Sequence, residues 1–220
     1  TSEKFFANPN SVHKLGKECK NVIDESIKTI TDLLDIKNNE LLFTSGASES
    51  NNTVLKGINA SHIITTRLEH SSINTPLGFF FFFWVKVSFV NLDENGLVDL
   101  NHLKSLITSE DTLVSIGMVN SEVGIRQDIE KIGKFLKKYP NVIFHSDITQ
   151  GLGKIKFNLE DVDLASFSFH KIYGLKGIGG LVKKEKIRIT PLIHGGKAIS
   201  VYRSGTPQTA LIASSATAFS

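Results

Sequence analysis

A serine, a histidine and a lysine lie together at the end of an apolar run. The run begins at Leu164, and Ser168, His170 and Lys171 are followed by a glycine-rich stretch to Gly180. It predicts a buried strand, so the three polar residues lie where that strand ends. A lysine in this position can form a Schiff base with a carbonyl compound. The same pattern also fits an ordinary strand end with a solvated lysine, so other residues have to decide between the two.

Polar residues also follow the other predicted strands. Because the carboxyl ends of parallel strands meet at one edge of a sheet, we expect them to converge on Lys171. The first group is a Gly/Ser/Thr turn that leads into a helix, an arrangement whose free backbone N–H groups suit an anion such as phosphate. In chain order, the residues that follow these strands are Ser45 to Ser48, which form the first group and include Ala47, then His70, Ser121, Asp147 and Gln150.

Taken together, these groups describe a site for pyridoxal phosphate. Lys171 would bind the cofactor covalently, and an ionised Asp147 would keep the ring nitrogen protonated. His70 would stack on the ring and move protons. A metal site built from His145, Asp147 and His170 is the competing interpretation, but the sequence lacks the HExxH or paired CxxC spacing typical of zinc sites.

Strands and helices alternate with short connections, which predicts an α/β fold with a mostly parallel sheet in one domain, residues 1–220. The aromatic tract at 79–84 is predicted to be a buried strand that continues to residue 90. Other strands are expected at 41–43, 62–66, 113–119, 142–147, from 164 and at 179–182. The first helix is expected to be capped by Asn10 or Ser11 and to run to about residue 34, and further helices are expected at 51–58, 99–107 and 129–139, and from 211.

Composition limits the functional classes. Of the 220 residues, 40% are hydrophobic and 21% charged, as in a globular protein, and the formal net charge of +3 favours neither a nucleic acid nor a membrane as partner. The one cysteine, Cys19, cannot form an intrachain disulfide and lies in an apolar helical stripe, so we expect a buried side chain. The chain starts without Met or a signal peptide, and we expect it to be part of a longer protein.

The segment Ser168-Phe169-His170-Lys171-Ile172-Tyr173-Gly174 resembles the lysine segment of the class V aminotransferase-like enzymes, and most of all the cysteine desulfurases of the NifS/IscS type. Further motifs match in the same order, and the likeness covers nearly the whole chain apart from the phenylalanine tract. They are residues 44–51, Glu69-His70, 119–124, 145–150, His194-Gly195-Gly196 and Arg203-Ser204-Gly205-Thr206-Pro207.

This resemblance implies the large domain of the PLP-dependent transferase fold type I, with the small C-terminal domain outside this chain. It also implies roles for individual residues. Lys171 would hold the cofactor and move the proton at the substrate α-carbon, and His70 would stack and act in acid/base steps. The remaining expected contacts are Asp147 to the ring nitrogen, Gln150 to the ring hydroxyl, Ser121 near that hydroxyl and the substrate, Ala47, Ser48, Ser168 and His170 to the phosphate, and Thr206 to the cofactor phosphate of the other subunit of a homodimer.

The implied activity is removal of sulfur from L-cysteine, which gives alanine and an enzyme persulfide that supplies an iron–sulfur scaffold protein. Members of this type are cytoplasmic in bacteria and mitochondrial in most eukaryotes. Two alternatives stay open: another class V enzyme, such as a selenocysteine lyase or an aminotransferase, and a non-catalytic partner of the assembly machinery.

Three departures from the family pattern accompany the resemblance. Ser121 replaces a usual asparagine. Phe169 replaces a glycine, which would place a bulky side chain beside the phosphate. The persulfide cysteine is expected outside this chain, because Cys19 does not match its position.

Overall fold

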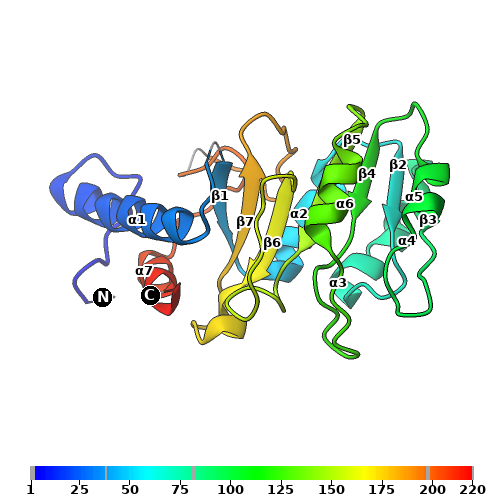
Figure 1. Ribbon diagram of the computed structural model, residues 1–220. Helices are drawn as coiled ribbons and strands as arrows, with labels where there is room; N and C mark the ends of the chain where they lie inside the picture. Colours follow the sequence, from blue (N-terminus) through cyan, green and yellow to red (C-terminus); the bar gives the residue numbers. More distant parts are fainter. Residues whose placement is uncertain (1–2, 38, 81–82, 197–198, 220) are drawn as a thin grey trace.

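The computed structural model describes residues 3–37, 39–80, 83–196 and 199–219, which form one seven-stranded sheet with helices on both faces (Figure 1). The order across the sheet is β1-β7-β6-β5-β4-β2-β3. The strands are β1 (Asn39–Thr44), β2 (His62–Thr65), β3 (Lys86–Phe89), β4 (Thr112–Ser115), β5 (Val142–Asp147), β6 (Leu164–Ser168) and β7 (Gly179–Lys184).

The sheet is mostly parallel, as the alternation of strands and helices predicts. Strands β3, β2, β4, β5 and β6 pair in parallel, whereas β7 is antiparallel to both of its neighbours, β6 and β1. The parallel strands therefore all end at the same edge of the sheet. That edge is where open α/β sheets bind their ligands.

Two helical layers bury the two faces of the sheet. In Figure 1, α5 and α6 lie in front of the strands and α2 behind them. The larger core cluster joins one face to α1, α5, α6 and α7, and the smaller one joins the other face to α2, α3 and α4. The helices are α1 (Lys14–Leu33), α2 (Ala47–Gly57), α3 (Ser71–Asn74), α4 (Leu77–Phe80), α5 (Leu100–Leu106), α6 (Ile129–Leu136) and α7 (Thr209–Phe219).

Helix boundaries follow the capping residues. Asp99 and Asp128 accept hydrogen bonds from the first-turn N–H groups of α5 and α6, which confirms the predicted starts. The predicted cap of α1, Asn10 or Ser11, is wrong: His13 is the N-cap, because its Nδ1 atom accepts from the Gly16 N–H, and the helix begins at Lys14. Cys19 is buried in the core, with 1% of its surface exposed, as expected.

The aromatic tract does not form the predicted buried strand. Leu77–Phe80 is a helical turn, β3 begins only at Lys86, and residues 81–82 lie outside the described part of the chain. Pro76 immediately precedes the turn, a position at which proline favours a helix start. Phe80 is buried, whereas Phe79 and Phe83 contact each other at the surface.

Within the described residues, no helix is both long enough and apolar enough to cross a membrane.

Candidate active site

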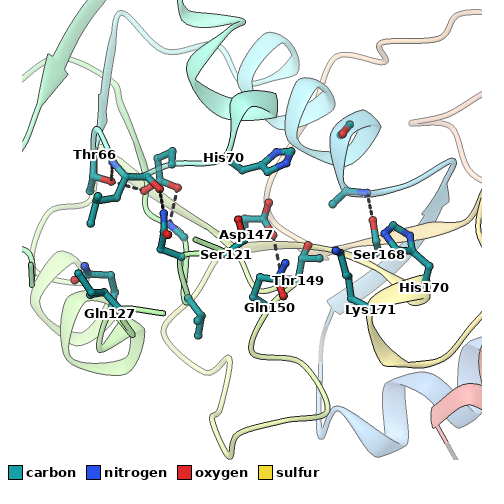
Figure 2. A pocket seen from close by; sticks show the side chains of 18 residues that line it. Thr66, His70, Ser121, Gln127, Asp147, Thr149, Gln150, Ser168, His170 and Lys171 are labelled. Carbon is teal, nitrogen blue, oxygen red and sulfur yellow. Dashed lines mark hydrogen bonds between the residues drawn. The ribbon is translucent and has the colours of Figure 1, made fainter. Parts of the chain in front are cut away.

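A pocket of about 320 Å³ lies at the carboxyl edge of the parallel strands (Figure 2). This volume is within the range of small-molecule sites, roughly 300–1,000 Å³. The segments that follow β1, β2, β4, β5 and β6 all line it, so the predicted convergence is present. Nine of the ten predicted site residues contribute: Ala47, Ser48, His70, Ser121, Asp147, Gln150, Ser168, His170 and Lys171.

The tenth predicted residue, Thr206, lies elsewhere. It is exposed and lines a shallow depression together with Phe5, Phe6 and Pro207. Within this chain it therefore does not reach the pocket that contains Lys171.

Lys171 lies in a short 3-10 helix, η2 (Phe169–Ile172), that follows directly from β6. Tyr173 ends this helix in the left-handed conformation, with φ of 66°, which is uncommon for a residue other than glycine. Figure 2 shows His70 on one side of Asp147 and Lys171 on the other. Partial burial and the positive charges of Lys171 and Lys176 lower the pKa of His170, which favours its uncharged form.

The turn after β1 is held against the end of β6. The Ala47 N–H donates to Ser168 Oγ at 2.7 Å, at the start of α2. A side chain at Gly179 would lie 2.5 Å from the Gly46 Cα atom, so only glycine lets β7 approach this turn so closely. The first turn of α2, including Ser48, therefore faces the same pocket as Ser168.

Glu49 connects α2 to the segment that carries Thr206. Its Oε1 atom accepts from Arg203 Nε at 2.9 Å, and its Oε2 atom accepts from the Ser45 N–H at 2.8 Å. Burial alone would raise the pKa of Glu49, but the hydrogen bonds from Arg203 and Ser45 outweigh burial and lower it.

The Asp147 carboxylate is fixed by two donors. Its Oδ1 atom accepts from the Thr149 N–H at 3.0 Å and its Oδ2 atom accepts from Asn51 Nδ2 at 2.7 Å. Gln150, one turn further on, lines the pocket and accepts from Lys154 Nζ at 3.2 Å. The carboxylate thus has a single orientation at the edge of the sheet.

His70 is the N-cap residue of α3. Its Nδ1 atom accepts from the Ser72 N–H at 3.1 Å and lies 2.8 Å from Ser72 Oγ. Both contacts fix the plane of the ring above the pocket. The first turn of α3 therefore holds the His70 side chain in place.

Glu69 is a partly buried carboxyl group that lines the pocket. Its Oε1 atom accepts from Thr66 Oγ1 at 2.7 Å and its Oε2 atom from the Gly117 N–H at 2.9 Å. Burial raises the pKa of Glu69 to about 7, and the negative charge of Asp147 acts in the same direction. The two hydrogen bonds act in the opposite direction and lower the pKa. Glu69 therefore joins the loop that carries His70 to the loop after β4.

We expect Glu69 to make stability fall as pH rises towards neutrality. Its pKa is higher in the folded protein, about 7, than the ordinary value of 4.5, so the folded state holds the proton more tightly. The associated stabilisation is complete below about pH 4.5 and is lost as pH rises through about 7, a change on the order of 3 kcal/mol. Glu69→Gln cannot titrate and should lack this dependence.

The measurement is urea unfolding of the cofactor-free protein at about pH 5 and about pH 8. The free energy of unfolding of the wild type minus that of Glu69→Gln should be smaller at about pH 8 than at about pH 5. An unchanged difference would contradict the raised pKa of Glu69.

Sequence reasoning did not assign site roles to three further residues. Asn51 and Glu69 appear within the quoted motifs, but their partners are distant in the chain. Thr149 lines the pocket, and its buried Oγ1 atom has no hydrogen-bond partner. Its position was the available signal, because the candidates Asp147 and Gln150 lie two residues before it and one residue after it.

Ser121 lines the pocket as an exposed residue. The side chain of the preceding Asn120 is already hydrogen-bonded. Its amide donates to the Leu68 carbonyl at 2.5 Å, and its Oδ1 atom accepts from the Glu122 and Val123 N–H groups of the following turn. The short hydroxyl of Ser121 is thus the polar group that this turn offers to the pocket beside Gln127.

Phe169 does not lie beside the predicted phosphate position, which corrects the expectation from sequence. Its side chain is fully buried and contacts the rings of Phe43 and Phe167, with centroids 6.2 Å and 5.2 Å away, and it does not line the pocket. The turn of η2 directs Lys171 to the pocket and Phe169 into the core, so the bulky residue leaves the site open.

Phe169→Ala should lower the free energy of unfolding by about 3–5 kcal/mol, because it removes a fully buried ring from the core. Urea unfolding measures this loss. The matched control is Phe6→Ala, since Phe6 is 72% exposed and should change stability by only about 0.5 kcal/mol. Equal effects of the two substitutions would contradict the placement of Phe169.

The metal site considered from the sequence is not formed. Both ring nitrogens of His145 are engaged by serine hydroxyls, Ser115 at 2.9 Å and Ser166 at 2.6 Å. In the part of the chain that the structure describes, no group of three or more His, Cys, Asp or Glu side chains could hold a metal ion.

Comparison with known proteins identifies a family and similar proteins within it. The family model described as Aminotransferase class-V matches residues 1–220. The cysteine desulfurase IscS of Rickettsia typhi is 43% identical over 218 residues, which cover 94% of this chain and 53% of the relative; that of Rickettsia bellii is 43% identical over 224 residues, with 97% and 54% covered. The chain thus spans about half the length of the curated relatives it matches.

Solved structures agree in fold. A NifS-like protein superposes with a TM-score of 0.93 at 36% identity, with 98% of this chain and 62% of the other covered. A structure described as SspA in complex with cysteine superposes with a TM-score of 0.91 at 34% identity, with 98% and 65% covered.

Proposed function

Because this chain belongs to the class V aminotransferase family, we propose that the full-length protein is a pyridoxal phosphate-dependent cysteine desulfurase. It would remove sulfur from L-cysteine, release alanine and hold the sulfur as a persulfide on an enzyme cysteine. The observation that carries the proposal is one pocket that contains Lys171, Asp147 and His70 together.

The residues of the pocket fit the cofactor. Thr149 Oγ1 is buried without a partner at the pocket wall, as expected of a polar atom that a bound group satisfies. The pocket also offers the amine of Lys171 for the aldehyde of the cofactor and the fixed carboxylate of Asp147 for its pyridine nitrogen. The imidazole of His70 suits the aromatic ring, and the first turn of α2 suits the phosphate.

The pocket residues divide the tasks in this proposal, and Lys171 and His70 each have two. Lys171 holds the cofactor covalently, Asp147 pairs with the ring nitrogen, Gln150 donates to the ring hydroxyl with Ser121 nearby, and Ala47, Ser48, Ser168 and His170 hold the phosphate. When bound, the cofactor acts as an electron sink for a carbanion at the substrate α-carbon. Lys171 Nζ takes and returns the proton at that carbon, and the imidazole of His70 covers the ring face and moves a second proton.

The sulfur acceptor would be a cysteine outside residues 1–220. Cys19 lies on the buried face of α1, with 1% of its surface exposed, and cannot meet a substrate. Residues 1–220 would be the cofactor-binding large domain, and the small C-terminal domain would supply the acceptor loop.

The protein would work as a homodimer. Thr206 is exposed and outside the pocket of its own chain, which is consistent with a contact to the cofactor phosphate of the partner subunit. The sulfur would pass to an iron–sulfur scaffold protein, in the cytoplasm of a bacterium or the mitochondrion of a eukaryote.

The test is turnover of L-cysteine by the full-length protein with pyridoxal phosphate and a thiol reductant. We expect alanine and sulfide in equal amounts, measured by amino-acid chromatography and a sulfide assay. L-Serine, which has a hydroxyl in place of the thiol, is the control and should give no alanine. Transfer of the amino group of cysteine to an added 2-oxo acid, without sulfide, would identify an aminotransferase. No reaction with cysteine would overturn the proposal: alanine from L-selenocysteine would then identify a selenocysteine lyase, and inactivity on both substrates a non-catalytic protein.

The departures from the family pattern give little support to a non-catalytic protein. Phe169 lies in the core and leaves the pocket open, so of the site departures only the Ser121 substitution faces the pocket.

A further inference from the structure

A chain of buried polar groups runs across three strands behind the pocket. Ser115 Oγ, at the end of β4, lies 2.9 Å from His145 Nδ1 on β5, and His145 Nε2 lies 2.6 Å from Ser166 Oγ on β6. The Ser166 hydroxyl donates to the Asn51 Oδ1 atom on α2. His145, Ser166 and Asn51 are completely buried, so each must find its hydrogen bonds within the protein.

At Asn51 the chain divides towards the two sides of the pocket. One N–H of its amide donates to Asp147 Oδ2 at 2.7 Å, and the other donates to Ser72 Oγ at 2.8 Å. Ser72 Oγ in turn lies 2.8 Å from His70 Nδ1. A single buried amide thus contacts the carboxylate directly and reaches the imidazole through one hydroxyl.

The direction of every hydrogen bond in this chain follows from the Asp147 carboxylate. An ionised carboxylate only accepts, so Asn51 must turn its N–H groups towards Asp147 and its oxygen towards Ser166. The Ser166 hydroxyl then donates to Asn51 and accepts from His145 Nε2, which leaves His145 Nδ1 to accept from Ser115. This last step holds because burial lowers the pKa of His145 to about 4, so its uncharged ring carries a proton on Nε2 and none on Nδ1.

The same logic fixes the form of His70. Because Ser72 Oγ accepts from Asn51, its own hydrogen is free to donate to His70 Nδ1. The Ser72 N–H points to the same nitrogen. The proton of an uncharged His70 ring is therefore on Nε2.

We propose that Asn51, held from behind by Ser166 and His145, is a positioning residue that sets the orientation of both the Asp147 carboxylate and the His70 imidazole. This role rests on the proposed function, because it matters only if these two side chains hold and act on a bound ring. It differs from a purely structural buried network in one respect: loss of the amide should change the binding and environment of the cofactor, and not only the stability of the fold.

The experiment uses the full-length protein and three variants. Asn51→Ala removes both branches, Ser72→Ala removes only the branch to His70, and Asn52→Ala is the matched control. Asn52 is the next residue on α2, and its amide donates only to the Ser48 carbonyl, one turn back in the same helix. Ser72 is partly exposed in a short helix, so its variant is expected to fold even if Asn51→Ala does not.

Two readouts separate positioning from stability. The dissociation constant of pyridoxal phosphate for the cofactor-free protein should rise roughly 10- to 100-fold in Asn51→Ala, the size of losing one hydrogen bond to a charged group. In Ser72→Ala it should stay within about threefold of the wild-type value, because the Asn51–Asp147 bond remains. The visible circular dichroism of the bound cofactor, which reports the orientation of its ring, should change in both variants and not in Asn52→Ala.

The failures of this proposal and of the proposed function are distinguishable. A wild-type protein that binds no pyridoxal phosphate would overturn the proposed function and with it the role of Asn51. Wild-type binding and turnover, with unchanged affinity and circular dichroism in Asn51→Ala and Ser72→Ala, would overturn the role of Asn51 alone. If Asn51→Ala does not fold, an unchanged circular dichroism spectrum in Ser72→Ala overturns it equally.

Discussion

Replacement of Lys171 by alanine is expected to lower the turnover of L-cysteine by about a thousand-fold or more, since it removes both the covalent attachment of the cofactor and a group that moves the α-proton. Lys171 is the lysine of η2 and lines the pocket that contains Asp147 and His70. The fold should be unaffected, because the side chain is exposed on a surface turn.

Two measurements test this expectation on the full-length protein. Steady-state production of alanine gives the loss of turnover. Borohydride reduction followed by intact-protein mass spectrometry shows whether the cofactor is bound covalently. The control is Lys186→Ala, an exposed lysine outside the pocket, which should keep both the adduct and the activity. A cofactor adduct that persists in Lys171→Ala would show that another amine is the attachment point.

Much of the site could be predicted because its signals are local in sequence. Apolar runs end in polar residues at Ser168, Asp147 and His70, and parallel strands bring such ends to one edge. The antiparallel direction of β7 follows from its short connection to β6, since a parallel crossover needs a dozen or more residues. Its position between β6 and β1 is set by packing and has no comparable local signal.

The remaining features depend on contacts between distant residues. Asn51 takes its role from Asp147, 96 residues away, and from Ser166, 115 residues away. The sequence also does not indicate the side to which Phe169 points. Every residue of β6 is buried, and the strand shows no alternation of polar and apolar positions. The helical turn Leu77–Phe80 runs against the strand preference of the aromatic residues in it.

Asp147→Asn is expected to lower the turnover of L-cysteine by about a hundred- to a thousand-fold, the effect typical of removing one fixed electrostatic contact from a catalytic site. The substitution removes the negative charge opposite the proposed position of the ring nitrogen. It also disturbs the support of the side chain. The two oxygens of Asp147 accept from the Thr149 N–H and from Asn51 Nδ2, and an amide has only one oxygen for these two donors.

Because one buried donor then faces an NH2 group, Asp147→Asn should also lower the free energy of unfolding by about 1–3 kcal/mol. Turnover, the visible spectrum of the cofactor and urea unfolding test the two effects separately. The matched control is Asp161→Asn, which breaks an ion pair with the exposed Lys137 and should leave stability nearly unchanged and turnover unaffected. Wild-type turnover in Asp147→Asn would mean that the charge of Asp147 does not act on the ring nitrogen, whereas lost stability with normal turnover would reduce Asp147 to a structural group.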